Sequence, residues 1–220
     1  MKTIKRNLLF IAIAFMITGC WEVTEEITIN KDGSGTYVNK LDISKYIEQY
    51  ETLSAMDSSN KQMIPDFKKA LDSSFRLVVL KYKLIKGVSS AKLDTSITNL
   101  YTISFNFSDV DVLNMALDSD KKEKTEKELY SWSKGTLVRK GGGVNMIDEL
   151  TETEGEQNEL MDSYTSEMHY KLIYHLPGAV KKMSNDNALL SDDKKTVTLE
   201  TNFNDVKKNA KLLMNEVKYK

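Results

Sequence analysis

The residues best suited to chemistry in this 220-residue chain are one cysteine, Cys20, and two histidines, His169 and His175. A single cysteine excludes an internal disulfide, a zinc knuckle and an iron–sulfur site, because each needs at least two cysteines. The two histidines lie on one predicted strand, where their spacing separates them by about 20 Å, too far to share a metal ion. Each is predicted to be an exposed strand residue, and we expect no metal and no cofactor.

The residues before Cys20 predict that its sulfur is modified. Three basic residues stand within the first six positions, an apolar run follows over residues 8–17, and Ile17-Thr18-Gly19-Cys20 resembles the lipobox of bacterial lipoproteins. Ten helical residues rise about 15 Å, half of a bilayer core, which is typical of a signal peptide rather than a membrane span. We expect residues 1–19 to be cleaved and Cys20 to carry the acyl chains (palmitate or similar) of a lipoprotein.

The charge that remains after cleavage excludes nucleic acid as a partner. Residues 20–220 contain 28 basic and 32 acidic residues, with no basic excess. No later apolar stretch approaches the roughly 20 residues of a membrane span. We therefore expect the lipid on Cys20 to anchor the protein to a membrane. The expected location is the periplasmic or cell-surface face of the cell envelope, with a lipid ligand or an envelope protein as the further partner.

Other candidate sites favour structure over catalysis. Asn30-Lys31-Asp32-Gly33-Ser34 lacks the later carboxylates of a calcium loop, whereas Asp-Gly between alternating runs is typical of a hairpin turn. Gly141-Gly142-Gly143 has no Lys or Ser/Thr at a P-loop position. The acids between 148 and 159 have no metal-ligand spacing and are predicted to be solvated. Since the chain also lacks a nucleophile elbow and a His-Glu-x-x-His pattern, we expect no enzymatic activity.

Alternation and spacing predict an α+β fold, a mostly antiparallel sheet packed on one side by two or three helices. We expect residues 20–220 to form a single exported domain, with a flexible or inserted segment at about 118–165 that includes a hairpin around Gly135. Strands are predicted at 23–29, 36–43, 88–94, 101–107, 168–176, 188–190 and 196–203, and helices at 46–56, 63–74, 110–117 and 206–213. In the clearest strand, Tyr101, Ile103, Phe105 and Phe107 should face the helices.

Two interpretations stay open. Residues 76–85 alternate like a strand but also continue the apolar stripe of the preceding helix, and the stripe favours a helix. Phe107-Ser108-Asp109-Val110 matches Phe203-Asn204-Asp205-Val206, 96 residues later, which fits either a duplicated half or one recurrent strand–cap–helix junction. The aromatic residues could line an apolar cavity, although their spacing favours an ordinary core: Trp21, Tyr37, Tyr46, Tyr50, Phe67, Tyr82, Tyr101, Phe105, Phe107, Tyr170 and Tyr174.

Two segments resemble the LppM-type bacterial lipoproteins. Over residues 168–220, the matching features are a strand that ends in Leu176-Pro177-Gly178, a polar turn, and Lys194-Lys195-Thr196 entering the next strand. Near the N-terminus, a hairpin with a Lys-Asp-Gly-Ser-Gly turn follows the lipobox. The resemblance implies an α+β exported domain whose relatives are associated with envelope lipids. Together with the absence of catalytic motifs, it leads us to expect a non-catalytic lipoprotein that binds a lipid or another apolar envelope molecule. The alternative is a protein–protein adaptor or structural lipoprotein of an envelope complex.

Overall fold

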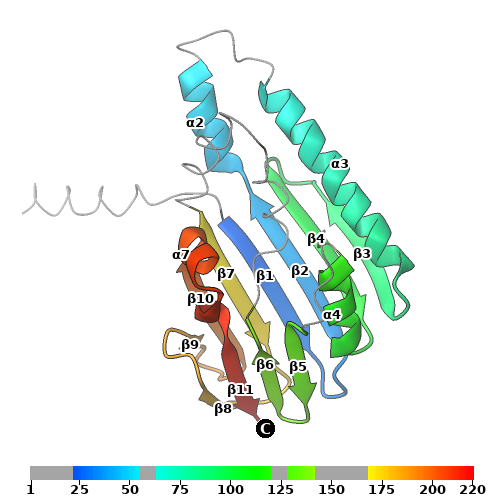
Figure 1. The fold of residues 1–220 in the computed structure, drawn as a ribbon, viewed down its shortest axis with the longest axis vertical. Coiled ribbons are helices and arrows are strands. Elements are labelled where there is room, and N and C mark those ends of the chain that lie inside the picture. Colours follow the sequence, from blue (N-terminus) through cyan, green and yellow to red (C-terminus); the bar gives the residue numbers. More distant parts are fainter. Residues whose placement is uncertain (1–21, 55–62, 120–127, 142–167) are drawn as a thin grey trace, which may run out of the picture.

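The computed structural model describes residues 22–54, 63–119, 128–141 and 168–220, and its strands form two sheets (Figure 1). The seven-stranded sheet has the order β3 (Val88–Asp94), β4 (Leu100–Phe107), β2 (Gly35–Asp42), β1 (Glu22–Ile29), β7 (His169–His175), β10 (Thr196–Asn202) and β9 (Leu189–Leu190). The four-stranded sheet has the order β5 (Tyr130–Ser133), β6 (Thr136–Arg139), β11 (Asn215–Tyr219) and β8 (Val180–Met183). The helices are α2 (Ser44–Ser54), α3 (Met63–Leu84), α4 (Val110–Ser119), α7 (Phe203–Lys208) and the 3-10 turn η2 (Ala210–Leu213).

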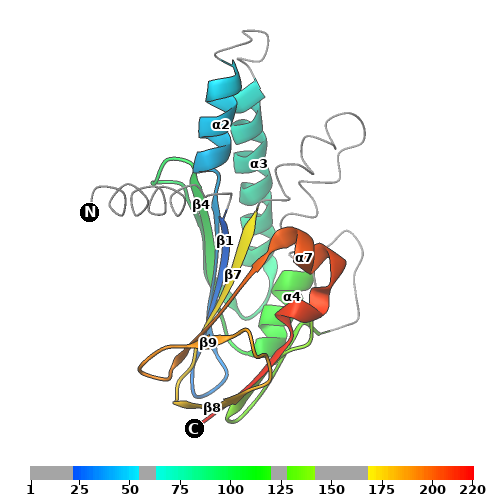
Figure 2. The same ribbon diagram turned by 90° about the vertical axis from the view of Figure 1, so that its left-hand side faces the viewer.

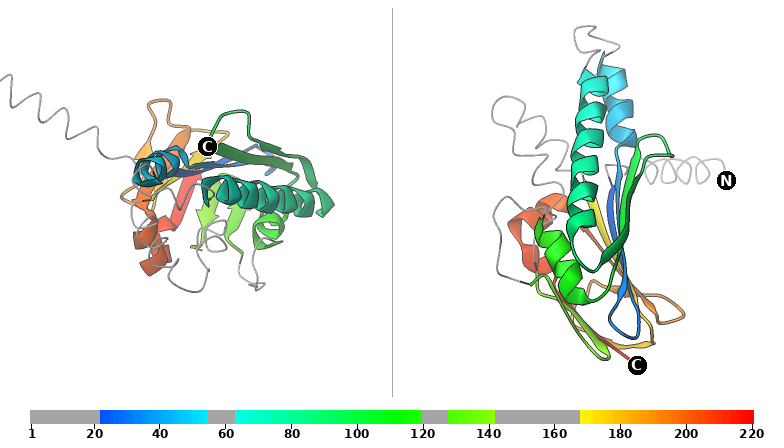
Figure 3. Two further views of the ribbon diagram at one scale, coloured as in Figure 1. Left: turned by 90° about the horizontal axis from the view of Figure 1, so that it is seen from above. Right: turned by 90° about the vertical axis from the view of Figure 1, so that its right-hand side faces the viewer.

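One face of the seven-stranded sheet is covered and the other is open (Figure 2). The small sheet, α3 and α4 all lie on the covered face, as the view from above shows (Figure 3). All neighbouring strands of the large sheet pair antiparallel except β1 and β7, which run parallel. The predicted α+β class and the mostly antiparallel sheet are therefore confirmed, and the second sheet is a feature that the sequence analysis did not predict.

Strand alternation places the apolar side chains on the covered face. Tyr101, Ile103, Phe105 and Phe107 are buried, whereas the intervening residues are half-buried or exposed, as predicted. The open face instead carries cross-strand ion pairs such as Lys40 with Glu26 at 2.6 Å and Lys171 with Glu200 at 2.8 Å. This division is the expected result for an antiparallel sheet with one solvated face.

Residues 76–84 are helical, because they continue the buried stripe of α3. Leu71, Phe75, Val78 and Tyr82 are buried at spacings of three and four residues along the helix. The helix ends at Leu84, shortly before the left-handed backbone of Gly87 at φ 97°. The ambiguous segment is thus resolved in favour of the helix.

The predicted C-terminal helix was wrong beyond residue 208. α7 ends at Lys208, and the side chain of Asn209 accepts a hydrogen bond from the Lys211 amide and so begins a separate turn, η2. The chain then forms β11, in which Asn215, Val217 and Tyr219 are buried alternately. β11 pairs with β6 and β8 and lies at the centre of the small sheet.

The two matched junctions are built differently. The Asp109 carboxylate accepts a hydrogen bond from the Val112 amide and so caps α4, as predicted. At the second junction the cap is Asn202, whose side chain accepts from the Asn204 amide, and Phe203 belongs to α7 rather than to the strand. The matched Asp205 therefore does not repeat the role of Asp109. The four residues do not by themselves indicate a duplication.

The segment predicted at about 118–165 is only partly described. Residues 128–141 form the predicted hairpin around Gly135, made of β5 and β6, and this hairpin contributes half of the small sheet. Residues 120–127 and 142–167, which include the acids at 148–159, lie outside the described residues. Among the helices that the structure describes, none combines the length and the apolar character needed to cross a membrane.

Candidate functional site

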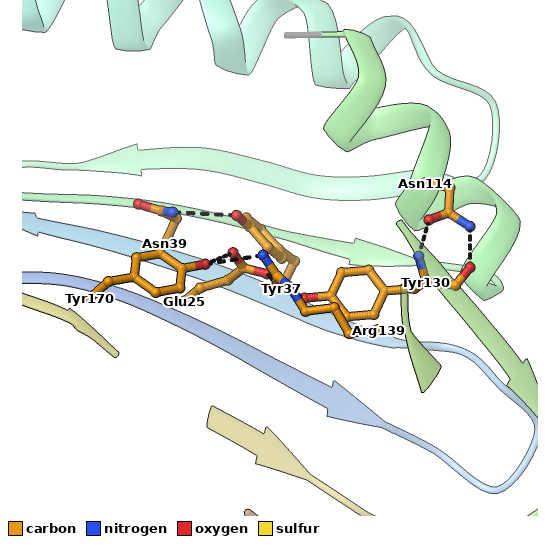
Figure 4. A network of polar contacts seen from close by, with 7 residues as sticks. All are labelled: Glu25, Tyr37, Asn39, Asn114, Tyr130, Arg139 and Tyr170. Atoms are coloured by element: carbon orange, nitrogen blue, oxygen red, sulfur yellow. Dashed lines mark hydrogen bonds and ion pairs between the residues drawn. The ribbon is translucent and has the colours of Figure 1, made fainter. Parts of the chain in front are cut away.

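A buried charged cluster lies between the two sheets (Figure 4). We call Glu25, Tyr130, Arg139 and Tyr170 the Glu25 cluster. Glu25 comes from β1, the fourth of seven strands in the large sheet, and Arg139 is the last residue of β6 in the small sheet. The Glu25 side chain is 7% exposed and that of Arg139 is fully buried. Charged side chains are rarely buried to this extent unless they are paired.

The carboxylate of Glu25 accepts hydrogen bonds at both oxygens. Oε1 receives Nη1 of Arg139 at 2.9 Å and the hydroxyl of Tyr130 at 2.6 Å. Oε2 receives the hydroxyl of Tyr170, which also lies 3.5 Å from Nη2 of Arg139. Nη1 of Arg139 further contacts the Tyr130 hydroxyl. The ion pair and the Tyr130 hydroxyl thus join β1 of the large sheet to the β5–β6 hairpin of the small sheet. The Tyr170 hydroxyl adds β7 to the same cluster.

Neighbouring residues extend this cluster toward α4 and β2. The side-chain amide of Asn114 donates to the Tyr130 carbonyl at 2.7 Å, and its oxygen accepts from the Tyr130 amide at 2.8 Å. On the other side, Asn39 donates to the Tyr37 hydroxyl at 3.3 Å. The Oδ1 atom of Asn39 and the Nε atom of Arg139 are buried and have no hydrogen-bond partner among the residues that the structure describes.

Burial and charge set the protonation of these groups. Burial raises the pKa of the Tyr130 and Tyr170 hydroxyls well above the usual value of 10.0, and the charge of Glu25 adds to this effect. Burial alone would lower the pKa of the Arg139 guanidinium, but the charge of Glu25 and then the tyrosines raise it well above its usual value. The phenols therefore remain neutral donors and Arg139 remains a cation.

This cluster was not predicted from the sequence, although two of its members stand at positions that indicate buried charges. Glu25 occupies an inward position in the run Val23, Glu25, Ile27, so a charge stands where alternation requires an apolar residue. Arg139 follows Leu137 in the same way. An inward charge in a strand predicts a buried partner, but the partner could not be identified because 114 residues separate the two.

The residues that the sequence analysis singled out do not meet at one site. His169 is exposed at the start of β7, and His175 lies at its far end, 3.8 Å from Glu26 on the open face. Asp32 accepts hydrogen bonds from the amide and hydroxyl of Ser34, so the hairpin interpretation of residues 30–34 is confirmed. Cys20 and Trp21 lie outside the described residues.

The aromatic residues of the described chain pack as a core. The rings of Tyr37 and Phe105 stack with centroids 5.1 Å apart, and Tyr82 lies 4.7 Å from Phe105. Phe75 meets Tyr101 edge-on at 5.3 Å. These contacts support the core interpretation of the aromatic residues over the cavity interpretation. Within residues 22–54, 63–119, 128–141 and 168–220, no group of three or more His, Cys, Asp or Glu side chains could hold a metal ion.

Comparison with known proteins leaves the family open. No protein-family model matches the chain, and no curated protein matches it. Among solved structures, the folded domain of LppM from Mycobacterium tuberculosis, determined by NMR, aligns over 92% of this chain and 91% of that domain. The identity is 11% and the TM-score is 0.39. This is a distant structural resemblance, and it supports no statement about function.

Proposed function

We propose that this chain is a bacterial lipoprotein precursor whose exported, non-catalytic domain acts at the face of a membrane in the cell envelope. The observation that carries the proposal is the sequence Ile17-Thr18-Gly19-Cys20 after a basic start and a short apolar run. Cleavage between Gly19 and Cys20 would leave the lipidated residue two positions before Glu22, where β1 begins. Trp21 alone would then separate the lipid-bearing residue from the folded domain.

Metabolic labelling with an alkyne-modified palmitate tests the anchor. Wild-type protein should take up the label and shift to the mass of the processed, acylated chain, and Cys20→Ser should take up none. The matched control Thr18→Ser keeps a small residue before the cleavage site and should label as the wild type does. Label that persists in Cys20→Ser, or a wild-type chain that stays unlabelled, contradicts the proposal.

The proposal that the domain is not an enzyme is supported by the state of its buried charges. The carboxylate of Glu25 accepts three hydrogen bonds, and its cationic partner, Arg139, is fully enclosed. A general acid or base must reach a substrate proton, which this arrangement prevents. Glu25 is therefore assigned a structural role. Replacing it should lower the free energy of unfolding, as discussed below.

A lipid or another apolar molecule is the second candidate for what the domain binds. The Asn39 Oδ1 and Arg139 Nε atoms favour it, because neither has a hydrogen-bond partner in the described part of the chain and a polar head group between the sheets would supply one. The test is native mass spectrometry of the full-length protein released from mild detergent. A co-purified lipid that is lost in Asn39→Leu would support this candidate. A chain that carries only its own acyl groups after incubation with envelope lipids would exclude it.

A further inference from the structure

Helix α3 carries an apolar stripe that none of the described parts of the chain (22–54, 63–119, 128–141 and 168–220) covers. Leu77, Leu80 and Leu84 are 57%, 56% and 86% exposed. The opposite side of the same helix is buried and includes Phe75 and Tyr82. Isolated exposed leucines are common on protein surfaces, but three in succession along one helix face mark a contact surface.

The spacing of this stripe is that of a helix that pairs with another helix. Two small exposed residues, Ala70 and Ser73, extend it toward the N-terminus, so the positions 70, 73, 77, 80 and 84 alternate in steps of three and four. This is the a/d pattern of a coiled-coil seam, and it covers about 21 Å of helix. We call these five residues the α3 stripe.

The residues that flank the α3 stripe are basic. Positions 70, 77 and 84 correspond to heptad position a, and positions 73 and 80 to position d. The residue directly before each position a is basic: Lys69, Arg76 and Lys83. Lys81 lies on the other side of the seam. Arg76 also pairs with Asp72 at 2.7 Å within the helix, which offsets part of its charge. Flanking charges of this kind decide which helix can pair with the seam.

Charge makes a second copy of this chain a poor partner. In a parallel pair of α3 helices, Arg76 would face Lys81 of the other copy, and in an antiparallel pair the three leading basic residues would face one another. Both arrangements bring basic residues of the two copies close to each other, and like charges at such positions destabilise a helix pair. The complementary partner is a helix with an apolar seam and with Asp or Glu at the flanking positions.

The position of α3 relative to the proposed lipid anchor at Cys20 argues against a bilayer as the surface that covers the α3 stripe. This argument depends on the proposed anchor. β1 begins at the anchor end of the sheet, and its last residue, Ile29, pairs with Gly35, which in turn pairs with Phe107. Phe107 pairs with Val88, the start of β3, directly after the end of α3. The C-terminal end of the α3 stripe is therefore about 25 Å along the strands from the anchor end, and α3 runs along the side of the sheet (Figures 1 and 3).

We propose that the α3 stripe is the docking site for an amphipathic helix of an envelope partner protein, with apolar residues in its seam and acidic residues beside the seam. This inference deepens the proposed function, since it gives the anchored domain the role of an adaptor. Of the two roles expected from the sequence, lipid binding and protein adaptor, it favours the adaptor. The acyl chains on Cys20 would anchor the domain at the membrane, and α3 would bind the partner protein.

Two designed peptides test the proposal on the full-length lipidated protein in phosphatidylcholine nanodiscs. Both are helical, about 21 residues long and have Leu at a and d; one has Glu and the other Lys at the flanking positions. Fluorescence anisotropy should show micromolar binding of the Glu peptide and at least tenfold weaker binding of the Lys peptide. Leu80→Glu should weaken Glu-peptide binding at least tenfold.

Two further variants make this test specific. The double change Lys81→Glu with Lys83→Glu should reverse the preference, so that the Lys peptide binds more tightly. The control Leu189→Glu alters a leucine that is 66% exposed on β9, at the opposite edge of the large sheet, and should leave binding unchanged. All of these positions are solvent-accessible, so circular dichroism should show wild-type melting. Equal binding of the two peptides, or no binding of either, overturns the proposal.

A fluorophore on the stripe distinguishes the other occupants. With the sulfur of Cys20 acylated, Leu84→Cys supplies a single free thiol for a polarity-sensitive label. Emission should shift to the blue on addition of the Glu peptide and stay unchanged when anionic phosphatidylglycerol is included in the nanodisc. A shift caused by the anionic lipid alone, or self-association that Leu80→Glu abolishes, overturns the partner-helix proposal. Loss of palmitate labelling would contradict the anchor and remove the argument against a bilayer, but the two peptides would still test the α3 stripe on the unlipidated chain, because they do not contact Cys20.

Discussion

Moving a carboxylate and a guanidinium out of water costs several kcal/mol for each ion, and their mutual attraction recovers this only with good geometry and further hydrogen bonds. Glu25 and Arg139 meet both conditions, since they are 2.9 Å apart and are joined by the hydroxyls of Tyr130 and Tyr170. Such a pair adds little compared with two apolar residues, but it penalises any packing of the sheets that separates the charges. At the residue scale, we therefore expect the pair to favour the one packing of the small sheet on the large sheet that brings the two charges together.

Glu25→Gln should lower the free energy of unfolding by about 3–5 kcal/mol, because it leaves Arg139 buried and unpaired. The control is Glu26→Gln, the next residue, which faces the open side and pairs with the half-buried Lys40. That change should cost at most about 1 kcal/mol. Urea unfolding followed by circular dichroism measures both, and equal losses would show that Glu25 is not the buried partner.

Removing both charges provides a further check. The double variant Glu25→Leu with Arg139→Met should recover most of the stability that Glu25→Gln loses, since it replaces a buried pair with apolar side chains of similar volume. A double variant as unstable as the single one would mean that the phenols, rather than the missing counter-charge, dominate the cost.

At the scale of elements, alternation decides which face of a strand is buried. Ile103 in β4 is 1% exposed, whereas its neighbour Ser104 is on the open face and lies opposite Lys92 of β3. Ile103→Asp should therefore destabilise the protein by several kcal/mol through an unpaired buried charge. Ser104→Asp should change stability by less than about 1 kcal/mol, because the new carboxylate lies in solvent beside a lysine. Thermal denaturation of the two variants compares them, and similar melting temperatures would refute this register.

Local patterns made most of these elements predictable. β2, β4 and β7 each alternate over seven or eight residues, and Asp109 is a cap-type residue before an apolar stripe. β11 alternates too, but it spans only five residues, and the helical spacing of Val206, Ala210 and Leu213 just before it competed with that signal. Short strands therefore give weaker signals than the helical periodicity beside them.

The pairing of distant elements could not be predicted in this way. The parallel contact of β1 with β7 joins segments more than 140 residues apart, and the small sheet combines a hairpin at 130–139 with the last strand described. Nothing local in either segment specifies the other. The same limit applies to the candidate site, where the sequence shows the inward positions of Glu25 and Arg139 but not that these two residues meet each other and the tyrosines.

At the scale of the whole molecule, one series of hydrogen bonds joins α4, the small sheet and the large sheet. Asn114 of α4 holds Tyr130 of β5, Tyr130 donates to Glu25 of β1, and Tyr170 of β7 donates to the other oxygen of the same carboxylate. Tyr174 lies beside this series of hydrogen bonds, and its ring is edge-on to that of Tyr130 with the centroids 6.3 Å apart. The state of these phenols is therefore linked to the folding of both sheets together.

This linkage predicts how stability changes in alkaline solution. Burial raises the pKa of Tyr130, Tyr170 and Tyr174 above the usual 10.0. Below about pH 10 the folded and unfolded states both hold these protons, so the three groups add no pH dependence. Above it the unfolded chain releases protons that the folded state retains, and the free energy of unfolding should fall by about 1.4 kcal/mol per pH unit for each tyrosine.

Tyr174→Phe isolates one of these contributions. The hydroxyl of Tyr174 is buried beside Tyr130 and Arg139, which are both bonded to Glu25, so its loss should cost at most about 1 kcal/mol at neutral pH. Urea unfolding of both proteins between about pH 9 and pH 11 should give a smaller alkaline loss for the variant, by about 1.4 kcal/mol per pH unit above the pKa of an unfolded tyrosine. Lysines that titrate in the same range contribute equally to both proteins and cancel in the difference. Parallel stability curves for wild type and variant would mean that Tyr174 titrates as an exposed phenol, which its burial in the sheet interface does not allow.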